Sequence, residues 1–205
     1  MRHGRTAWNA LRRFQGRSDI PLDEEGRAQA RALAVHLAAE RFDVALASDL
    51  TRATVTAAAI GAACGIAVEP EPRLREMHFG AWEGLTWTEI SARYPQVAQH
   101  PETSPRYFVP AGGESFEELS LRVGLVLADL TARLPANGRG LIVSHAGVMH
   151  ALLAVALDDS EAEALSVSLR PASIMRMSGD GSLPWRLDRV NEVAPPLADS
   201  PTAPP

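Results

Sequence analysis

The chain has 205 residues and a formal net charge of −5, with 46% hydrophobic and 22% charged residues. This length and composition predict one globular domain and exclude a wholly disordered or collagen-like chain. The negative net charge argues against general binding to nucleic acid or to an anionic membrane, so we expect neither as a partner. All 20 basic residues are arginines, which excludes lysine Schiff-base chemistry and a lysine-dependent phosphate loop.

The single cysteine, Cys64, cannot form an intramolecular disulfide and belongs to no metal-binding spacing. We therefore expect a cytoplasmic protein. The longest apolar stretch, residues 141–157, is interrupted by polar residues and is shorter than a membrane-spanning helix requires. The N-terminus has no apolar signal core, but its arginine-rich, acid-free first eighteen residues also fit a transit peptide, and that alternative stays open.

The N-terminal half of the chain alternates predicted helices with short extended segments. Asp23 and Asp49 each follow the pattern of a residue that begins a helix, and Gly65 follows the pattern of one that ends it. In chain order, the helix, strand, helix and extended run are predicted over 23–42, 44–47, 49–63 and 66–68.

The C-terminal half begins with two capping boxes, at Thr86 and Ser115, each followed by a predicted helix. The first helix should end before Pro95, and the second carries an apolar stripe at helical spacing as far as Leu134. The proline-rich stretch 101–110 is predicted to be a loop or lid. A strand, a helix and two more strands are then predicted over 141–143, 148–157, 172–177 and 185–190. The tail, residues 194–205, contains five prolines and is expected to be disordered.

This alternation of helices and buried strands predicts an α/β domain with a mainly parallel sheet. The ligand crevice of such a domain lies beyond the carboxyl ends of its strands. Positive charge is concentrated in residues 1–20, which hold five arginines against one acidic residue, Asp19. Several guanidinium forks suit a phosphoryl group, although a solvated basic arm is the alternative. The string Arg2-His3-Gly4 favours the phosphate site, because glycine lets the backbone approach an anion closely.

Five motifs follow one another in an order that extends over nearly the whole domain. They are Arg2-His3-Gly4-Arg5-Thr6 with Trp8-Asn9, Gln15-Gly16 with Asp19, Ser48-Asp49-Leu50 with Arg52, Glu76 with Phe79-Gly80, and Ser144-His145-Ala146-Gly147. Together they resemble the motifs of the histidine phosphatase superfamily, in its phosphoglycerate-mutase-like branch. The resemblance implies a three-layer α/β/α sandwich with a mainly parallel central sheet over residues 1–193.

The resemblance also implies a role for each matching residue. His3 would attack phosphorus and form a phosphohistidine that water later hydrolyses. Arg2, Arg52 and His145 would surround the phosphoryl oxygens, and Glu76 would act as general acid and then as general base. Metal ions and cofactors are then not needed, and we expect none. Contacts to the substrate are expected from Arg5, Asn9, Gly16 and Ala146.

Some residues keep a second interpretation. Glu76 by itself would more simply pair with Arg73 or Arg75, but the motif around it favours the catalytic role. The aromatic residues form either the wall of an apolar substrate pocket or part of the core: Trp82, Trp87 and Tyr107. The remaining histidines are expected to be non-catalytic: His36, His78, His100 and His150.

The chain departs from the family pattern at two positions. Position 5 is arginine, where the family usually has Glu or Gln, which predicts a more positive pocket rim. Met1 directly precedes Arg2, where family members have a hydrophobic strand inside the sheet. We therefore expect the native protein to begin upstream of Met1, and His3 to be poorly positioned if it does not. The intact mass of the native protein tests this.

The leading function is a metal-independent phosphatase acting on a small phosphorylated metabolite. A phosphoglycerate-type phosphomutase is second, because residues 81–113 offer only Arg93 and Arg106 where such mutases have a longer basic insertion. A non-catalytic module that binds a phosphorylated ligand is third. No oligomeric state is indicated.

Overall fold

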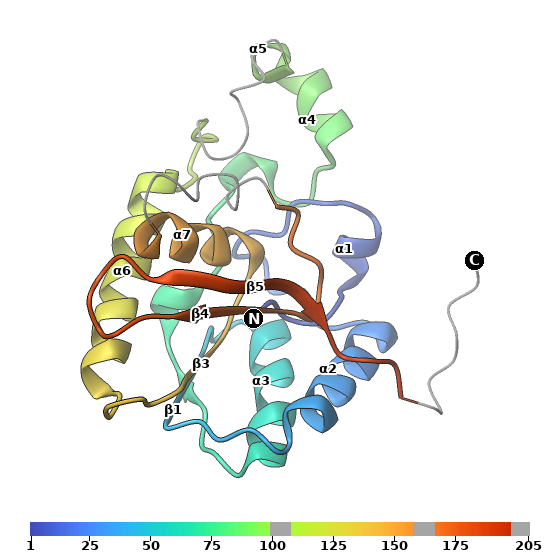
Figure 1. Ribbon diagram of the computed structural model, residues 1–205. Helices are drawn as coiled ribbons and strands as arrows, with labels where there is room; N and C mark the ends of the chain where they lie inside the picture. The colour runs from blue at the N-terminus through green and yellow to red at the C-terminus, as the bar shows by residue number, and fades with distance from the viewer. Residues whose placement is uncertain (99–107, 158–166, 198–205) are drawn as a thin grey trace.

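The protein, seen in a computed structural model that describes residues 1–98, 108–157 and 167–197, has a central parallel sheet (Figure 1). Its strands are β1 (Val44–Ala47), β2 (Glu69–Pro70) and β3 (Gly140–Val143), in the order β2-β1-β3. An antiparallel pair, β4 (Ser173–Ser178) and β5 (Arg186–Val193), continues the strand layer. Most of the loop predicted at 101–110 and of the tail predicted at 194–205 lies outside the described residues.

Residues 1–3 join the two groups of strands. Arg2 pairs with Ser144 in parallel, and His3 N donates to the Ser144 carbonyl at 2.9 Å. On the other side, Arg2 N donates to the Ser173 carbonyl and Ala172 N donates to the His3 carbonyl, both at 2.9 Å. His3 is therefore held from both sides, and the expectation that it would be poorly positioned in a chain beginning at Met1 is wrong.

Two pairs of helices cover the two faces of the sheet, which gives the expected three layers (Figure 1). On one face, α2 (Glu24–Leu37) and α3 (Thr51–Cys64) pack against the strands. On the other face, α6 (Phe116–Arg133) and α7 (Ala146–Ala156) do the same. The predicted stripe of α6 is buried at Leu119, Val123 and Leu130. Each of these side chains contributes about 1.5–3 kcal/mol of burial free energy.

The short elements lie around the open end of the sandwich. Trp82, Ile90 and Val97 form a small separate core there, and all three are almost completely buried. Trp82 is therefore a core residue, the second of the two roles considered for it. The elements of this end are α1 (Ala7–Ala10), the 3₁₀ helices η1 (Pro72–Leu74) and η2 (Gly80–Trp82), α4 (Trp87–Arg93) and α5 (Pro95–Ala98).

The N-terminus of α3 differs from the prediction. The helix begins at Thr51, and the carboxylate of Asp49 instead accepts two hydrogen bonds from Arg75, at 2.8 and 2.6 Å. The capping acceptor comes from a distant loop: Asp19 accepts from the backbone N–H of Thr51 at 2.8 Å and from its hydroxyl at 2.7 Å. This tertiary cap brings the loop of residues 16–19 onto the end of α3.

Three other boundaries shift because the chain must turn to reach its neighbours. The helix α2 ends at Leu37 instead of residue 42, and Glu40 in the turn that follows pairs with Arg176 of β4. The extended run expected at 66–68 pairs with β1 only at residues 69–70, since residue 66 is still bonded to the end of α3. The last helix begins two residues early, at Ala146. Every helix within the described ranges is too short or too polar to span a bilayer.

Candidate active site

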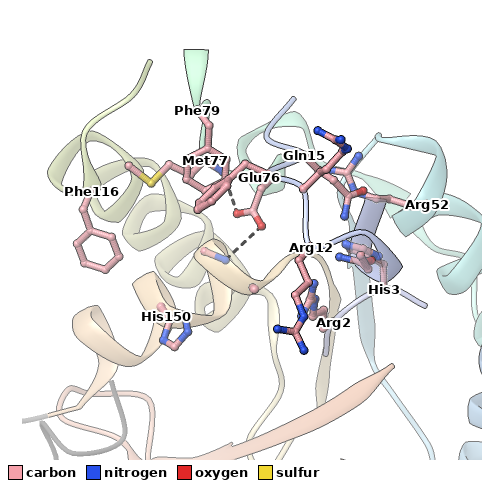
Figure 2. A pocket seen from close by; sticks show the side chains of 15 residues that line it. Arg2, His3, Arg12, Gln15, Arg52, Glu76, Met77, Phe79, Phe116 and His150 are labelled. Carbon is pink, nitrogen blue, oxygen red and sulfur yellow. Dashed lines mark hydrogen bonds between the residues drawn. The ribbon is translucent and has the colours of Figure 1, made fainter. Parts of the chain in front are cut away.

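A cavity of about 430 Å³ opens beyond the carboxyl end of β3, a size suited to a small molecule. Figure 2 shows that its side chains fall into two groups. Arg2, His3 and Arg52 lie on one side, Phe79 and Phe116 lie on the other, and Glu76 lies between them. The full lining comprises Arg2, His3, Asn9, Arg12, Arg13, Phe14, Gln15, Arg52, Glu76, Met77, Phe79, Phe116, Ala146, Gly147 and His150.

His3 is buried, with 2% of its surface exposed, and its ring orientation is fixed by its own loop. The Nδ1 atom lies 2.6 Å from the carbonyl of Gly4. Because a carbonyl only accepts hydrogen bonds, Nδ1 carries the proton, and the lone pair of the neutral ring is on Nε2. Burial, together with the charges of Arg2 and Arg52, holds the pKa of His3 well below its usual value of 6.5. The imidazole is therefore neutral and nucleophilic near pH 7.

Arg52 is a fully buried cation at the cavity, held by the loop that also caps its helix. Its guanidinium donates to the carbonyl of Ser18 at 2.8 Å and to the carbonyl of Gly16 at 2.7 Å. The Nε–H donates to Nδ1 of His145 at 3.2 Å. These bonds hold the guanidinium in one orientation. Its positive charge therefore faces the cavity before a ligand binds, and the side chain does not need to move.

His145 packs against His3, with the ring centroids 5.1 Å apart in an edge-on arrangement. Since its Nδ1 accepts from Arg52, its Nε2 donates to the hydroxyl of Ser48 at 2.8 Å. Burial and the nearby Arg52 charge hold its pKa well below 6.5. Both ring nitrogens are thus engaged, and the residue supports Arg52 and His3 from beneath the cavity lining.

Arg2 adds a second guanidinium to the cavity. One of its terminal nitrogens donates to the carbonyl of Leu169 at 2.5 Å, while its Nε has no partner among the described residues. Burial lowers the pKa of this side chain, the Glu76 carboxylate opposes that effect, and Arg52 adds to it. The buried Arg52 and the half-buried Arg2 face one cavity with a single carboxylate, which favours an anionic ligand.

Glu76 is 8% exposed and faces the cavity between its polar and apolar sides (Figure 2). Its Oε1 accepts from the backbone N–H of Met77 at 2.9 Å, and its Oε2 accepts from that of Gly147 at 3.3 Å. The second donor belongs to the first turn of α7, so this helix fixes the orientation of the carboxyl group.

The backbone of Glu76 is held from behind by α6. Arg122 donates to the Glu76 carbonyl at 3.2 Å and also to the Arg73 carbonyl. The same guanidinium makes a bidentate contact with Glu114, at 2.6 and 2.8 Å. Arg73 pairs with Glu71 and Asp129, and Arg75 pairs with Asp49. The alternative pairing of Glu76 with Arg73 or Arg75 is therefore not what the structure shows.

The four residues expected to contact substrate are placed differently from one another. Asn9 and Ala146 line the cavity. Gly16 does not line it, and its carbonyl accepts a hydrogen bond from Arg52 instead. Arg5 lies outside the lining, and its guanidinium pairs with Asp23 and Glu25. The positive rim expected from Arg5 is thus wrong, since two carboxylates of the α2 N-terminus neutralise it.

Several lining residues carry no expected role from the sequence. The sequence indicates Arg12 and Arg13 only as part of the basic N-terminal stretch, and it indicates no role for His150. The apolar side is built by Met77, Phe79 and Phe116, whose spacing alone does not separate a pocket wall from a core. Trp87 does not line the cavity, and Tyr107 lies outside the described residues.

Residues 1–193 match the family model described as the histidine phosphatase superfamily (branch 1). A protein of Photorhabdus laumondii named "Probable phosphoglycerate mutase GpmB" is 34% identical over 186 residues, covering 90% of this chain and 85% of that protein.

Two solved structures are similar in fold and sequence. The mycobacterial glucosyl-3-phosphoglycerate phosphatase Rv2419c, in complex with VO3, is 35% identical with a TM-score of 0.82, covering 93% of this chain and 96% of that one. A phosphoserine phosphatase from Entamoeba histolytica, in complex with 3-phosphoglyceric acid, is 26% identical with a TM-score of 0.78 and covers 94% of each chain. The similarity extends to the whole sandwich.

Proposed function

Because the chain belongs to the histidine phosphatase superfamily, branch 1, we propose that it is a phosphatase that hydrolyses a small phosphomonoester through a phosphohistidine on His3. The name of the similar mycobacterial protein, a glucosyl-3-phosphoglycerate phosphatase, supports hydrolysis of a phosphorylated metabolite. The observation that carries the proposal is the hydrogen bond from His3 Nδ1 to the Gly4 carbonyl at 2.6 Å. It leaves the Nε2 lone pair as the nucleophile of a neutral ring inside a cage of guanidinium groups.

The first half of the reaction transfers the phosphoryl group to the protein. The lone pair of His3 Nε2 forms a bond to phosphorus as the bond from phosphorus to the ester oxygen breaks. Glu76 gives its proton to that leaving oxygen, and the alcohol departs. Arg2 and Arg52 stabilise the negative charge that spreads over the phosphoryl oxygens.

The second half returns the protein to its starting state. Water attacks phosphorus and gives a proton to Glu76, while the bond between phosphorus and Nε2 breaks and inorganic phosphate is released. His3 becomes neutral again, and Glu76 is again the protonated acid. The proton gained from water equals the proton lost to the alcohol, so both residues complete a full cycle.

We propose that this chemistry proceeds without a divalent cation, since the guanidinium groups of Arg2 and Arg52 supply the positive charge that a metal supplies elsewhere. The experiment is phosphate release from p-nitrophenyl phosphate with and without EDTA. We expect release that is unchanged by EDTA and abolished in His3→Ala. His36→Ala is the matched control, because His36 is on the far helix α2 and pairs with Glu192.

The proposal fails if the His3→Ala variant releases phosphate as fast as the original protein. It also fails if a radiolabelled substrate leaves no acid-labile phosphate on His3. Binding of phosphate without any turnover would favour the third function considered, a phospho-ligand binding module.

A phosphoglycerate-type mutase is the second candidate, because the relative from Photorhabdus laumondii is named a probable phosphoglycerate mutase. A mutase keeps its phosphoryl group on the histidine until it returns it to the product. Incubation with 3-phosphoglycerate separates the two reactions: isomerisation without free phosphate supports the mutase, and release of phosphate supports the phosphatase.

A further inference from the structure

Arg12 is an arginine of the cavity that the proposed mechanism does not use. It follows α1, and its side chain is exposed although it lines the cavity. Figure 2 shows it on the same side as Arg2 and His3. His3 and Arg52 are buried at the base of the site, so the exposed Arg12 lies nearer its mouth.

The guanidinium of Arg12 also forms no hydrogen bond or ion pair with the described residues. The other arginines of the N-terminal stretch bind acidic side chains or carbonyl groups: Arg5 pairs with Asp23, Arg13 with Glu89, Arg17 with Glu114, and Arg2 donates to Leu169. The Arg12 side chain makes no hydrogen bond or ion pair with any residue in 1–98, 108–157 or 167–197. Among these arginines, its positive charge is the one that stays available to a ligand.

The backbone of Arg12 gives a second, independent indication. Its φ is +52°, in the left-handed region that glycine adopts freely and that a residue with a Cβ adopts at a cost. The turn around it is fixed, since Arg12 N donates to the Asn9 carbonyl at 3.1 Å and Arg13 N to the Trp8 carbonyl at 2.8 Å. An arginine therefore occupies a position where local conformation favours glycine, and it presents its side chain to the cavity.

We propose that Arg12 is a specificity-determining residue that binds a second anionic group, a carboxylate or a further phosphate, on the leaving group of the substrate. This inference rests on the proposed function. With the phosphoryl group against His3 and Arg52, the rest of the ligand extends toward the mouth, where the Arg12 fork accepts two oxygens of an anion. The apolar side, with Phe79 and Phe116, presents mainly hydrocarbon instead.

The test compares kcat/KM for three substrates of similar size. Glycerol 3-phosphate has no second anion, 3-phosphoglycerate has a carboxylate, and 1,3-propanediol bisphosphate has a second phosphate. We expect at least one of the two compounds with a second anionic group to be preferred over glycerol 3-phosphate by about tenfold or more in kcat/KM. Whichever of the two is preferred identifies the anion that Arg12 binds.

Arg12→Gly is the decisive variant, because glycine suits the backbone and only the guanidinium is lost. It should lower kcat/KM for the preferred substrate by about tenfold or more, change that for glycerol 3-phosphate less than about threefold, and leave Tm unchanged or higher. Arg12→Lys should recover part of the preference. Arg17→Gln is the matched control, since it removes the same charge from the same N-terminal stretch but from a residue outside the cavity lining.

An equal loss on all three substrates, or no preference in the unaltered protein, overturns the inference. A binding measurement tests the role of Arg12 even if the protein proves not to be a phosphatase. In the His3→Ala background, which cannot turn over, calorimetry should show that Arg12→Gly weakens binding of the preferred ligand by about tenfold or more and leaves glycerol 3-phosphate unchanged. Unchanged affinity for all three ligands would reject Arg12 even if no substrate is hydrolysed.

Discussion

The carboxylate of Glu76 occupies its position because Gly147 has no side chain. A Cβ at Gly147 would lie 2.4 Å from Glu76 Oε1, closer than any real contact allows. The backbone N–H of the same residue donates to Oε2 at 3.3 Å. One glycine therefore both provides the space for the Glu76 carboxyl group and supplies a hydrogen bond to it.

Gly147→Ala is expected to separate activity from stability. Alanine is favoured over glycine within a helix by about 0.5–1 kcal/mol, so the fold should be retained. The displaced carboxylate should lower kcat for p-nitrophenyl phosphate by about 10²-fold. Steady-state kinetics and a thermal melt measure the two effects.

The matched control is Gly124→Ala in α6, where the nearest atom to a new Cβ is a methyl of Val155 at an ordinary 3.5 Å. This variant should keep its kcat. Wild-type kcat in Gly147→Ala would mean that the position of Glu76 does not matter to the reaction.

At the scale of residues, a sequence motif predicts which side chains gather but not which of their atoms face the ligand. Arg2, His3, Arg52 and Glu76 do line one cavity, as their motifs indicate. The motif around Arg5 could not show that Asp23 and Glu25 neutralise it, since that pairing depends on how α2 packs. The sequence likewise cannot show that Arg12 has no acidic partner among the described residues while Arg5, Arg13 and Arg17 each have one.

The helix α3 shows how an element and the site depend on each other. Asp19 caps this helix from a separate loop, and the same loop supplies the carbonyl groups of Gly16 and Ser18 that hold Arg52. The cap and the orientation of the guanidinium are therefore parts of one interaction between loop and helix.

Asp19→Ala should consequently affect both stability and catalysis. Loss of a helix cap costs about 1 kcal/mol, or a Tm decrease of about 2–4 °C for a chain of this size. Because the loop that orients Arg52 loosens, kcat should fall by ~10-fold as well. Denaturation and kinetics on the same preparation give both values.

Ser115→Ala removes a comparable cap, at α6, that has no contact with Arg52. It should lose stability while keeping kcat. If Asp19→Ala does the same, the loop does not position the guanidinium.

Elements with a local signal are the ones that the sequence predicts best. The helix behind Ser115 has a capping box and a continuous apolar stripe, and it is present as expected over Phe116–Arg133. The predicted start of α3 is wrong because Asp49 is equally suited to cap a helix or to bind Arg75, and only tertiary structure decides between them. The predicted end of α2 is wrong for a similar reason, since Ala38 and Ala39 favour a helix that the approach to β1 interrupts.

At the scale of the molecule, the two central histidines connect protonation with stability. His3 and His145 are buried, and burial holds the pKa of each well below 6.5 in the folded protein. The unfolded chain, where both titrate normally, binds more protons as the pH falls below about 6.5. Proton binding therefore favours unfolding in this range, and stability decreases with decreasing pH.

We expect each histidine to contribute up to about 1.4 kcal/mol per pH unit to this slope below pH ~6.5. Urea denaturation at a series of pH values between about 5 and 6.5 measures it. His3→Asn should reduce the slope by up to about 1.4 kcal/mol per pH unit, whatever its effect on the stability at pH 7. An unchanged slope would show that His3 is protonated in the folded protein.

The alternation of helices and strands predicts the α/β class, and the three layers that the family resemblance implies are present. The hydrogen-bond partners that residues 1–3 find at the junction between the parallel strands and the β4–β5 pair could not be predicted, because they lie in distant segments of the chain. Pairings of this kind between distant segments leave no periodic pattern.

That junction also sets an order of events during synthesis. The backbone groups of Arg2 and His3 are bonded to Ser144, Ala172 and Ser173, which a ribosome adds some 140 to 170 residues later. A nascent chain therefore cannot fix the position of His3 until residues 144–173 have been synthesised. If the proposed function holds, polypeptides that end before residue 144 should be inactive, because His3 has no fixed position in them.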